Sequence, residues 1–161
     1  MIQQSYTNKE WEEKEKEYID IINSIILPIN PTPIEVIQNV SRLDEIYTEA
    51  SFDYSNFKRK LELAVMDLKN AEIEYFSIIK QQQQNNGCKI TENDVKGLVK
   101  TYISNNVING YSSDLYTLVK YYTFRETFME QVLKLICEKK QSLNIIAGMI
   151  EVMKEKIEKN I

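Results

Sequence analysis

The sequence predicts an all-α protein built on a long antiparallel helical hairpin that resembles a coiled coil. Only four glycines and three prolines occur among 161 residues, and the prolines lie close together between positions 28 and 33. A chain with so few helix-breaking residues favours long helices over many short strands. Two long segments, 33–82 and 113–159, also repeat apolar residues at alternating steps of three and four, which is typical of coiled coils.

An amphipathic helix is predicted at the N-terminus. Thr7 and Glu10 have the spacing of a capping box, and the segment "LPINPTP" ends the helix because proline disfavours helical backbone in the residue before it. We therefore expect residues 1–30 to form an N-terminal helix and residues 31–161 to form the hairpin domain. The apolar stripe of the first helix comprises Trp11, Tyr18, Ile22 and Ile25.

The first long helix is predicted from about residue 33 to about residue 82. Thr32 and Glu35 make a capping box around Pro33, a residue favoured in the first helical turn. A strict seven-residue repeat sustained over such a length predicts a left-handed supercoil with a partner helix. The repeat comprises Val36, Val40, Leu43, Tyr47, Ala50, Tyr54, Phe57, Leu61, Ala64, Leu68, Ala71, Tyr75 and Ile78.

The connection contains a short helix. We interpret the glutamine run "KQQQQNN" as a solvated loop or a fraying helix end. Thr91 then has the position of an N-cap for a helix over about 92–104, and "SNNVINGYSSD" interrupts the chain again. Ser112 or Ser113 is the expected cap of the last helix, over about 113–159.

The last helix carries the same repeat, with Arg125 and Lys139 at two positions where an apolar residue is expected. Antiparallel pairing would remove both apolar stripes from water at about 25 cal/mol per Å². We expect a register in which Ile78 faces Leu115. The repeat comprises Leu115, Leu118, Tyr122, Arg125, Met129, Val132, Ile136, Lys139, Leu143, Ile146, Ile150, Met153 and Ile157.

The expected register gives both cations an acidic neighbour. Arg125 comes beside Asp67, and Lys139 comes beside Asp53, so that two ion pairs between the helices would fix the register. The alternative is that Arg125 and Lys139 face a groove of an oligomer and bind phosphates there.

The composition argues against an enzyme. The chain has no histidine, so the commonest general base and metal ligand are absent. Cys88 and Cys137 lack the spacing of metal ligands and favour a reduced, cytoplasmic location. We find no glycine-rich phosphate loop and no apolar run long enough to cross a membrane, and we expect no cofactor and no metal.

Charge is unevenly distributed along the chain. The formal net charge is −4, and residues 9–20 carry six acids against three lysines. Residues 80–125, at the turn end of the hairpin, carry a net +3. Such a basic end, repeated in an oligomer, would favour single-stranded DNA as a partner. The candidate nucleic-acid-binding residues are Lys80, Lys89, Lys96, Lys100, Lys120 and Arg125.

Two helices cannot bury all the apolar side chains of this sequence. We therefore expect either that the first helix packs across the hairpin or that chains share the remaining surface in a homo-oligomer. The candidate interface residues are Trp11, Ile22, Ile25, Ile26, Phe124 and Phe128.

Three segments resemble helical proteins encoded beside phage recombination genes, and the UvsY-type recombination mediators. They are "LDEIYTEASFDYSNFKRKLELAVMDLKNAEIEYF", "ITENDVKGLVKTYI" and "LVKYYTFRETFMEQVLKLICEKKQSLNIIAGMI", within about residues 40–153. The resemblance implies a ring-forming helical protein that binds single-stranded DNA. Such a mediator helps a recombinase displace a single-strand-binding protein, and both would be partners.

The alternative function is that of a phage-encoded protein-interaction module. It would inhibit a host or defence complex, or assist assembly, through its helical surfaces. In that case the acidic first helix would imitate nucleic acid.

Overall fold

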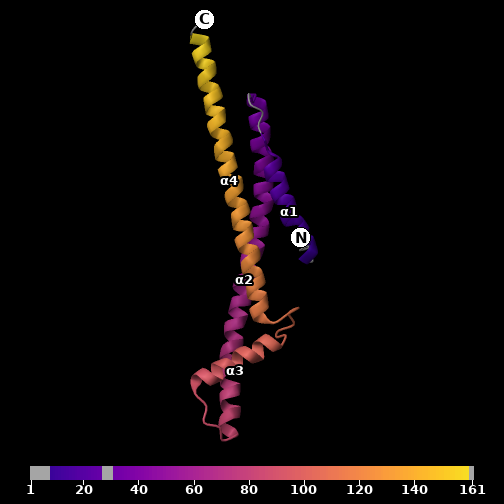
Figure 1. Ribbon diagram of the computed structural model, residues 1–161, viewed down its shortest axis with the longest axis vertical. Coiled ribbons are helices and arrows are strands. Elements are labelled where there is room, and N and C mark those ends of the chain that lie inside the picture. Colours follow the sequence, from indigo (N-terminus) through magenta and orange to yellow (C-terminus); the bar gives the residue numbers. More distant parts are fainter. Residues whose placement is uncertain (1–7, 27–30, 160–161) are drawn as a thin grey trace. The chain divides into compact units, whose positions relative to one another are not determined.

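A computed structural model describes residues 8–26 and 31–159, and the predicted all-α fold is confirmed (Figure 1). The described residues contain no strand and form four helices, whose bounds lie within three residues of the predicted ones for α2, α3 and α4. The proposed cap Thr7 lies outside the described residues. The helices are α1 (Asn8–Ser24), α2 (Pro33–Asn85), α3 (Glu92–Asn105) and α4 (Leu115–Lys159).

The chain divides into two compact units. Unit 1 comprises Met1–Asp53 and Met129–Ile161, and unit 2 comprises Tyr54–Phe128. Each long helix therefore contributes one part to each unit, and the division does not follow the boundary that we expected near residue 30. Within each unit, α2 and α4 run antiparallel (Figure 1).

The predicted capping box of Thr32 and Glu35 is present, and the predicted N-cap Thr91 is part of a second one. The backbone N–H of Thr32 donates to the Glu35 carboxylate at 2.7 Å, while the N–H of Glu35 donates back to the Thr32 hydroxyl at 3.3 Å. Thr91 and Asp94 make the same reciprocal pair at the start of α3. These bonds satisfy N–H groups that have no partner inside a helix, and they fix where α2 and α3 begin.

The first turn of α4 is capped by Asp114 and not by the predicted Ser112 or Ser113. The Asp114 carboxylate accepts a hydrogen bond from the N–H of Thr117 at 2.9 Å. This bond lowers the pKa of the Asp114 carboxyl below its usual value. Aspartate competes well with serine at an N-cap because its full charge also interacts favourably with the helix dipole.

The glutamine run is helical rather than a loop. α2 continues to Asn85, and the N–H of Gly87 then bonds to the carbonyl of Gln84. Gly87 has φ of 71°, in the left-handed region that glycine adopts without steric cost. Helix α2 therefore ends shortly before Gly87, the residue that takes up this conformation.

Unit 1 is a three-helix arrangement in which α1 packs on α2 and α4. Lys14 of α1 lies 2.8 Å from the Asp53 carboxylate and 2.9 Å from the Glu49 carboxylate. The Tyr18 hydroxyl also donates to Asp53, at 2.7 Å. The packing of α1 is thus both apolar and electrostatic. The buried apolar residues of unit 1 include Trp11, Ile22, Ile25, Leu43, Ala50, Val132, Ile136 and Leu143.

Unit 2 is held together by α3, which crosses α2 (Figure 1). The ring of Tyr75 on α2 contacts the ring of Tyr102 on α3, with ring centroids 4.5 Å apart. Helix α3 therefore covers the α2 apolar stripe around Ala71 and Tyr75. The core of the unit comprises Ala71, Val95, Val99, Ile103 and Leu115.

The expected register is wrong by about one heptad. Leu115 shares its core cluster with Ala71, whereas Ile78, its predicted neighbour, is exposed. In unit 1, Lys140 of α4 contacts Asp44 of α2. The expected register placed this region of α4 beside Asp53, more than two helical turns further along α2. A shift of one heptad keeps apolar positions opposite one another, so periodicity alone does not distinguish the two registers.

Candidate functional site

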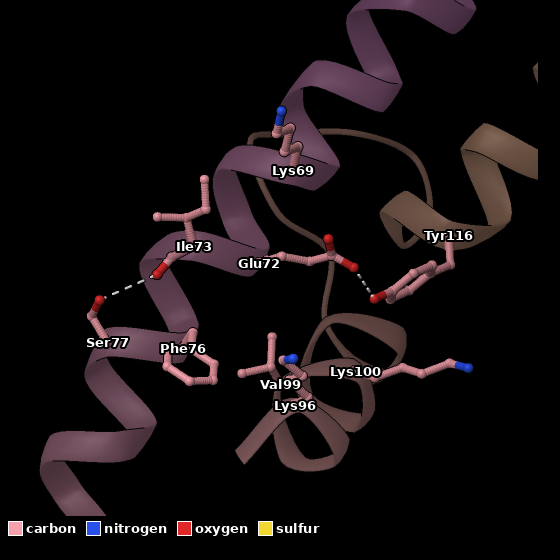
Figure 2. Close-up of a pocket in the computed structure, with 9 residues that line it drawn as sticks. All are labelled: Lys69, Glu72, Ile73, Phe76, Ser77, Lys96, Val99, Lys100 and Tyr116. Atoms are coloured by element: carbon pink, nitrogen blue, oxygen red, sulfur yellow. Dashed lines mark hydrogen bonds between the residues drawn. The ribbon is translucent and has the colours of Figure 1, made fainter. Parts of the chain in front are cut away.

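The candidate functional site is a pocket in unit 2, between α2, α3 and the start of α4 (Figure 2). The pocket has a volume of about 640 Å³, within the range typical of small-ligand sites. It combines apolar side chains with charged ones. The lining residues are Lys69, Glu72, Ile73, Phe76, Ser77, Lys96, Val99, Lys100 and Tyr116.

The apolar part of the pocket comes from α2 and α3. Phe76 of α2 and Val99 of α3 point toward one another (Figure 2). Val99 belongs to the buried core of unit 2, and Phe76 packs against that core with part of its ring exposed. Ile73, one turn earlier on α2, is 62% exposed although it is a large apolar residue. The pocket therefore offers apolar surface that this chain does not itself cover.

Three lysines surround this apolar surface. Lys96 and Lys100 are four residues apart and so lie on the same side of α3. Lys69 lies one heptad before Phe76 on α2, which places both on the same face of that helix. All three lysines are exposed, and Lys69 and Lys100 extend away from the apolar part of the pocket (Figure 2).

Sequence analysis identified Lys96 and Lys100 but not Lys69. Lys69 was missed because the basic segment was taken to begin at Lys80. Its heptad spacing from Phe76 is the signal that would have found it.

Glu72 and Tyr116 form the polar wall of the pocket. The Tyr116 hydroxyl donates to the Glu72 carboxylate at 2.6 Å (Figure 2). Partial burial, and then this bond to an anion, raise the pKa of Tyr116 to about 12. The bond links the first turn of α4 to α2, and it leaves a carboxylate facing a site that is otherwise basic.

The other predicted DNA-binding residues lie outside the pocket lining. Lys80 forms an ion pair with Glu92 at 3.9 Å, and its amine also lies 5.7 Å from the centre of the Phe76 ring. Lys89 and Lys120 are exposed. Arg125 is only 5% exposed, so this side chain is not on the surface that the lysines form.

The four residues of the predicted ion pairs have other partners. Asp53 pairs with Lys14 of α1, and Lys139 donates to the backbone carbonyl of Ile22 near the end of α1. A cation is favoured there because the last carbonyls of a helix carry partial negative charge. Both corrections have the same cause: the expectation that the first helix packs across the hairpin did not include contacts of that helix with Asp53 or Lys139.

In unit 2, Asp67 accepts a hydrogen bond from the Tyr111 hydroxyl at 2.5 Å. This bond, together with partial burial, raises the pKa of Tyr111 to about 12. The guanidinium of Arg125 lies 5.0 Å from the centre of the Tyr121 ring, an arrangement that stabilises a buried cation. The contacts described for Asp67 and Arg125 are thus with Tyr111 and Tyr121, respectively.

The candidate interface residues fall into two groups. Trp11, Ile22 and Ile25 are buried within unit 1 by the packing of α1, so they are not available to another chain. Ile26 and Phe124 are exposed, and Phe128 is half-buried.

The site's chemistry suits binding. Among residues 8–26 and 31–159, no group of three or more Cys, Asp or Glu side chains is arranged to hold a metal ion. In the same part of the chain, no helix has both the length and the apolar character needed to cross a membrane.

No family model matches the chain, and comparisons with curated proteins and with solved structures found no match.

Proposed function

We propose that this chain is a non-enzymatic accessory protein of DNA recombination or replication, which binds single-stranded DNA through unit 2 and acts with protein partners as an oligomer. The observation that carries the proposal is the pocket of unit 2, where Lys69, Lys96 and Lys100 line the same pocket as the half-buried ring of Phe76. Cations that follow a backbone, together with aromatic rings for bases, are the usual means by which proteins bind single strands.

The distribution of charge supports the same proposal. Unit 2 carries ten Lys and Arg residues against eight Asp and Glu residues, whereas unit 1 carries ten against sixteen. The net charge of −4 is therefore the sum of a negative unit 1 and a positive unit 2. Because attraction to phosphates acts over about a Debye length, roughly 8 Å in physiological salt, the local charge matters more than the total.

The direct test is a fluorescence-anisotropy titration of a labelled single-stranded oligonucleotide. We expect binding at micromolar protein and low salt. If three lysines contact phosphates, the logarithm of the association constant should fall with the logarithm of salt concentration, with a slope of about −2. An unbound oligonucleotide under these conditions would contradict the proposal.

The matched variants change the same number of charges in the two units. Replacing Lys69, Lys96 and Lys100 by Gln should abolish most of the salt-dependent binding. The control replaces Lys16, Lys154 and Lys156 of unit 1, which are equally exposed, and should leave binding nearly unchanged. Equal losses in the two triple variants would mean that binding is unspecific attraction to the whole chain.

A second candidate function is the protein-interaction module, an inhibitor or assembly factor. It is favoured by exposed apolar residues near the end of α4, where Ile145, Met149 and Val152 are each more than half exposed. The acidic surface of α1 is the part that would imitate nucleic acid. A pull-down from host lysate separates the two functions: a stoichiometric host enzyme favours inhibition, and a recombinase or single-strand-binding protein favours mediation.

A further inference from the structure

We propose that the pocket of unit 2 receives one base of the bound strand, while the lysines at its edge bind the phosphates on either side of that nucleotide. This inference rests on the proposed binding of single-stranded DNA and identifies where, and by which groups, a nucleotide is held. It makes binding depend on the base as well as on the charged backbone.

The apolar part of the pocket fits a flat aromatic ligand. Phe76 and Val99 face one another across it, and the exposed side chain of Ile73 extends the same surface along α2 (Figure 2). A volume of about 640 Å³ exceeds what a single base needs and also leaves room for its sugar. Stacking on an aromatic ring is available to every base, so the pocket need not be selective for sequence.

Two of the cations, Lys69 and Lys100, extend away from the apolar part of the pocket (Figure 2). Lys69 comes from α2, and Lys96 and Lys100 come from α3, so that positive charge borders the apolar surface from two helices. Lys80 adds a further cation beside the ring of Phe76. A nucleotide within a strand matches this arrangement, because its base is uncharged and a phosphate lies on each side of it.

Glu72 argues against simpler anions. Its carboxylate is held in the wall of the pocket by the hydroxyl of Tyr116. A compact anion such as inorganic phosphate, placed at the centre, would be repelled by this carboxylate. A fatty acid would offer it no hydrogen-bond donor. A base does not carry charge, and every DNA base has an N–H group that can donate to a carboxylate: an amino group in adenine, cytosine and guanine, and the ring N3–H in thymine.

The test compares two oligonucleotides of equal length and equal charge, one of thymidine and one whose sugars carry no base. Both are titrated against the full chain by anisotropy. We expect the oligonucleotide with bases to bind about tenfold more tightly, as is typical when one base stacks on an aromatic side chain. Since the phosphates are the same, the two should show the same dependence on salt.

Protein variants then locate the base. Phe76→Ala should remove most of the tenfold difference and leave binding of the abasic oligonucleotide unchanged. Ile73→Ala, at an exposed position that is not needed for the core, should reduce the difference in part. The control is Phe52→Ala, which removes a ring from unit 1 at a position as exposed as Ile73, 62%.

The outcomes separate this inference from the proposed function. If neither oligonucleotide binds, the proposed function fails and the base pocket fails with it. If both bind with equal affinity, DNA binding stands and the base pocket is wrong. If the base matters but neither Phe76→Ala nor Ile73→Ala reduces the difference, the base lies elsewhere and the inference is overturned.

Discussion

Asp53 illustrates how a single residue can be recognised as important and still be assigned the wrong partner. Its position beside the heptad stripe of α2 indicated an ion pair, and the structure gives it one, but with Lys14 of α1. The side chain is 4% exposed and also accepts the hydroxyl of Tyr18. Burial alone would lower the pKa of Lys14, but its bonds to Asp53 and Glu49 raise it above the ordinary lysine value.

Asp53→Asn is therefore expected to destabilise unit 1. It removes a charged acceptor from two donors that are largely buried, and bonds of this kind contribute about 2 kcal/mol. Urea unfolding followed by circular dichroism measures the change. The matched control is Asp44→Asn, which weakens the more exposed pair with Lys140 and should cost less than about 1 kcal/mol. Equal losses would show that the contacts of Asp53 are no stronger than those of a surface pair.

The tyrosines of unit 2 give a prediction about alkaline pH. Tyr111 and Tyr116 each donate to a carboxylate, and the pKa of each is raised to about 12 from the ordinary value of 10. A group whose pKa is higher in the folded state than in the unfolded state contributes its full stabilisation at pH values below the unfolded pKa. That stability is lost as pH rises from about 10 toward 12.

Ultraviolet absorbance of the tyrosinate form measures this titration. The native chain should show a component with a midpoint near pH 12, and the double variant Tyr111→Phe/Tyr116→Phe should lack it. The variant should also lose less stability between pH 10 and 12 than the native chain. Tyr54→Phe serves as the control, since among residues 8–26 and 31–159 no hydrogen bond from this tyrosine to a carboxylate is seen. Identical curves for the native chain and the double variant would contradict the predicted shifts.

At the scale of the helices, most of the fold could be predicted and the register could not. Prolines, glycines and capping boxes determine where helices begin and end, so local sequence suffices for α2 and α3. Pairing between helices depends on which heptads face each other, and each heptad of α4 fits several of α2. In the structure α3 shares one core with Ala71 and Leu115, so the pairing also involves a helix that the heptad repeats do not describe.

The candidate site was predicted in part for the same reason. Lys96 and Lys100 follow from charge counting along the chain, because that calculation needs no tertiary structure. Lys69 and Phe76 join them only because α3 crosses α2 at this point. Arg125 was included by the same counting and is excluded by burial. Sequence thus identifies charges, and packing decides which of them share a surface.

The register can be tested by crosslinking within unit 1. After Cys88 and Cys137 are replaced by Ser, cysteines at positions 44 and 140 should be joined by a short bifunctional thiol reagent, because these side chains are in contact. Cysteines at positions 53 and 139, the pair of the expected register, should react less. Mass spectrometry at low protein concentration identifies the intramolecular product. Preferential crosslinking of 53 to 139 would restore the original register.

At the scale of the whole molecule, acidic and basic character are segregated between the two units. Unit 1 has an excess of six acids and unit 2 an excess of two cations, although both include parts of the same two helices. One consequence is that DNA binding assigned to unit 2 would leave unit 1 free for protein contacts. The proposed oligomer is then best sought on unit 1.

The last turns of α4 are the surface on which we expect two copies of the chain to associate. Ile145, Met149 and Val152 are spaced by four and three residues, so they form one apolar stripe on consecutive turns. Glu151, Lys154, Glu155 and Lys156 lie close to this stripe and carry both signs of charge. Mixed charge of this kind suits a second, antiparallel copy of the same helix, because each acid can meet a cation of the partner.

Sedimentation velocity measures whether this stripe mediates self-association. We expect Met149→Glu combined with Val152→Lys to shift the chain toward the monomer at micromolar concentration, since it places charges within the apolar contact. The control is Ile34→Glu combined with Ile37→Lys, two equally exposed apolar positions at the start of α2. A distribution of species that is unchanged in the α4 variant, or changed equally in both, would exclude this end of α4 as the contact. Circular dichroism of the variants establishes that the helices remain intact, so that a loss of association reflects the surface and not the fold.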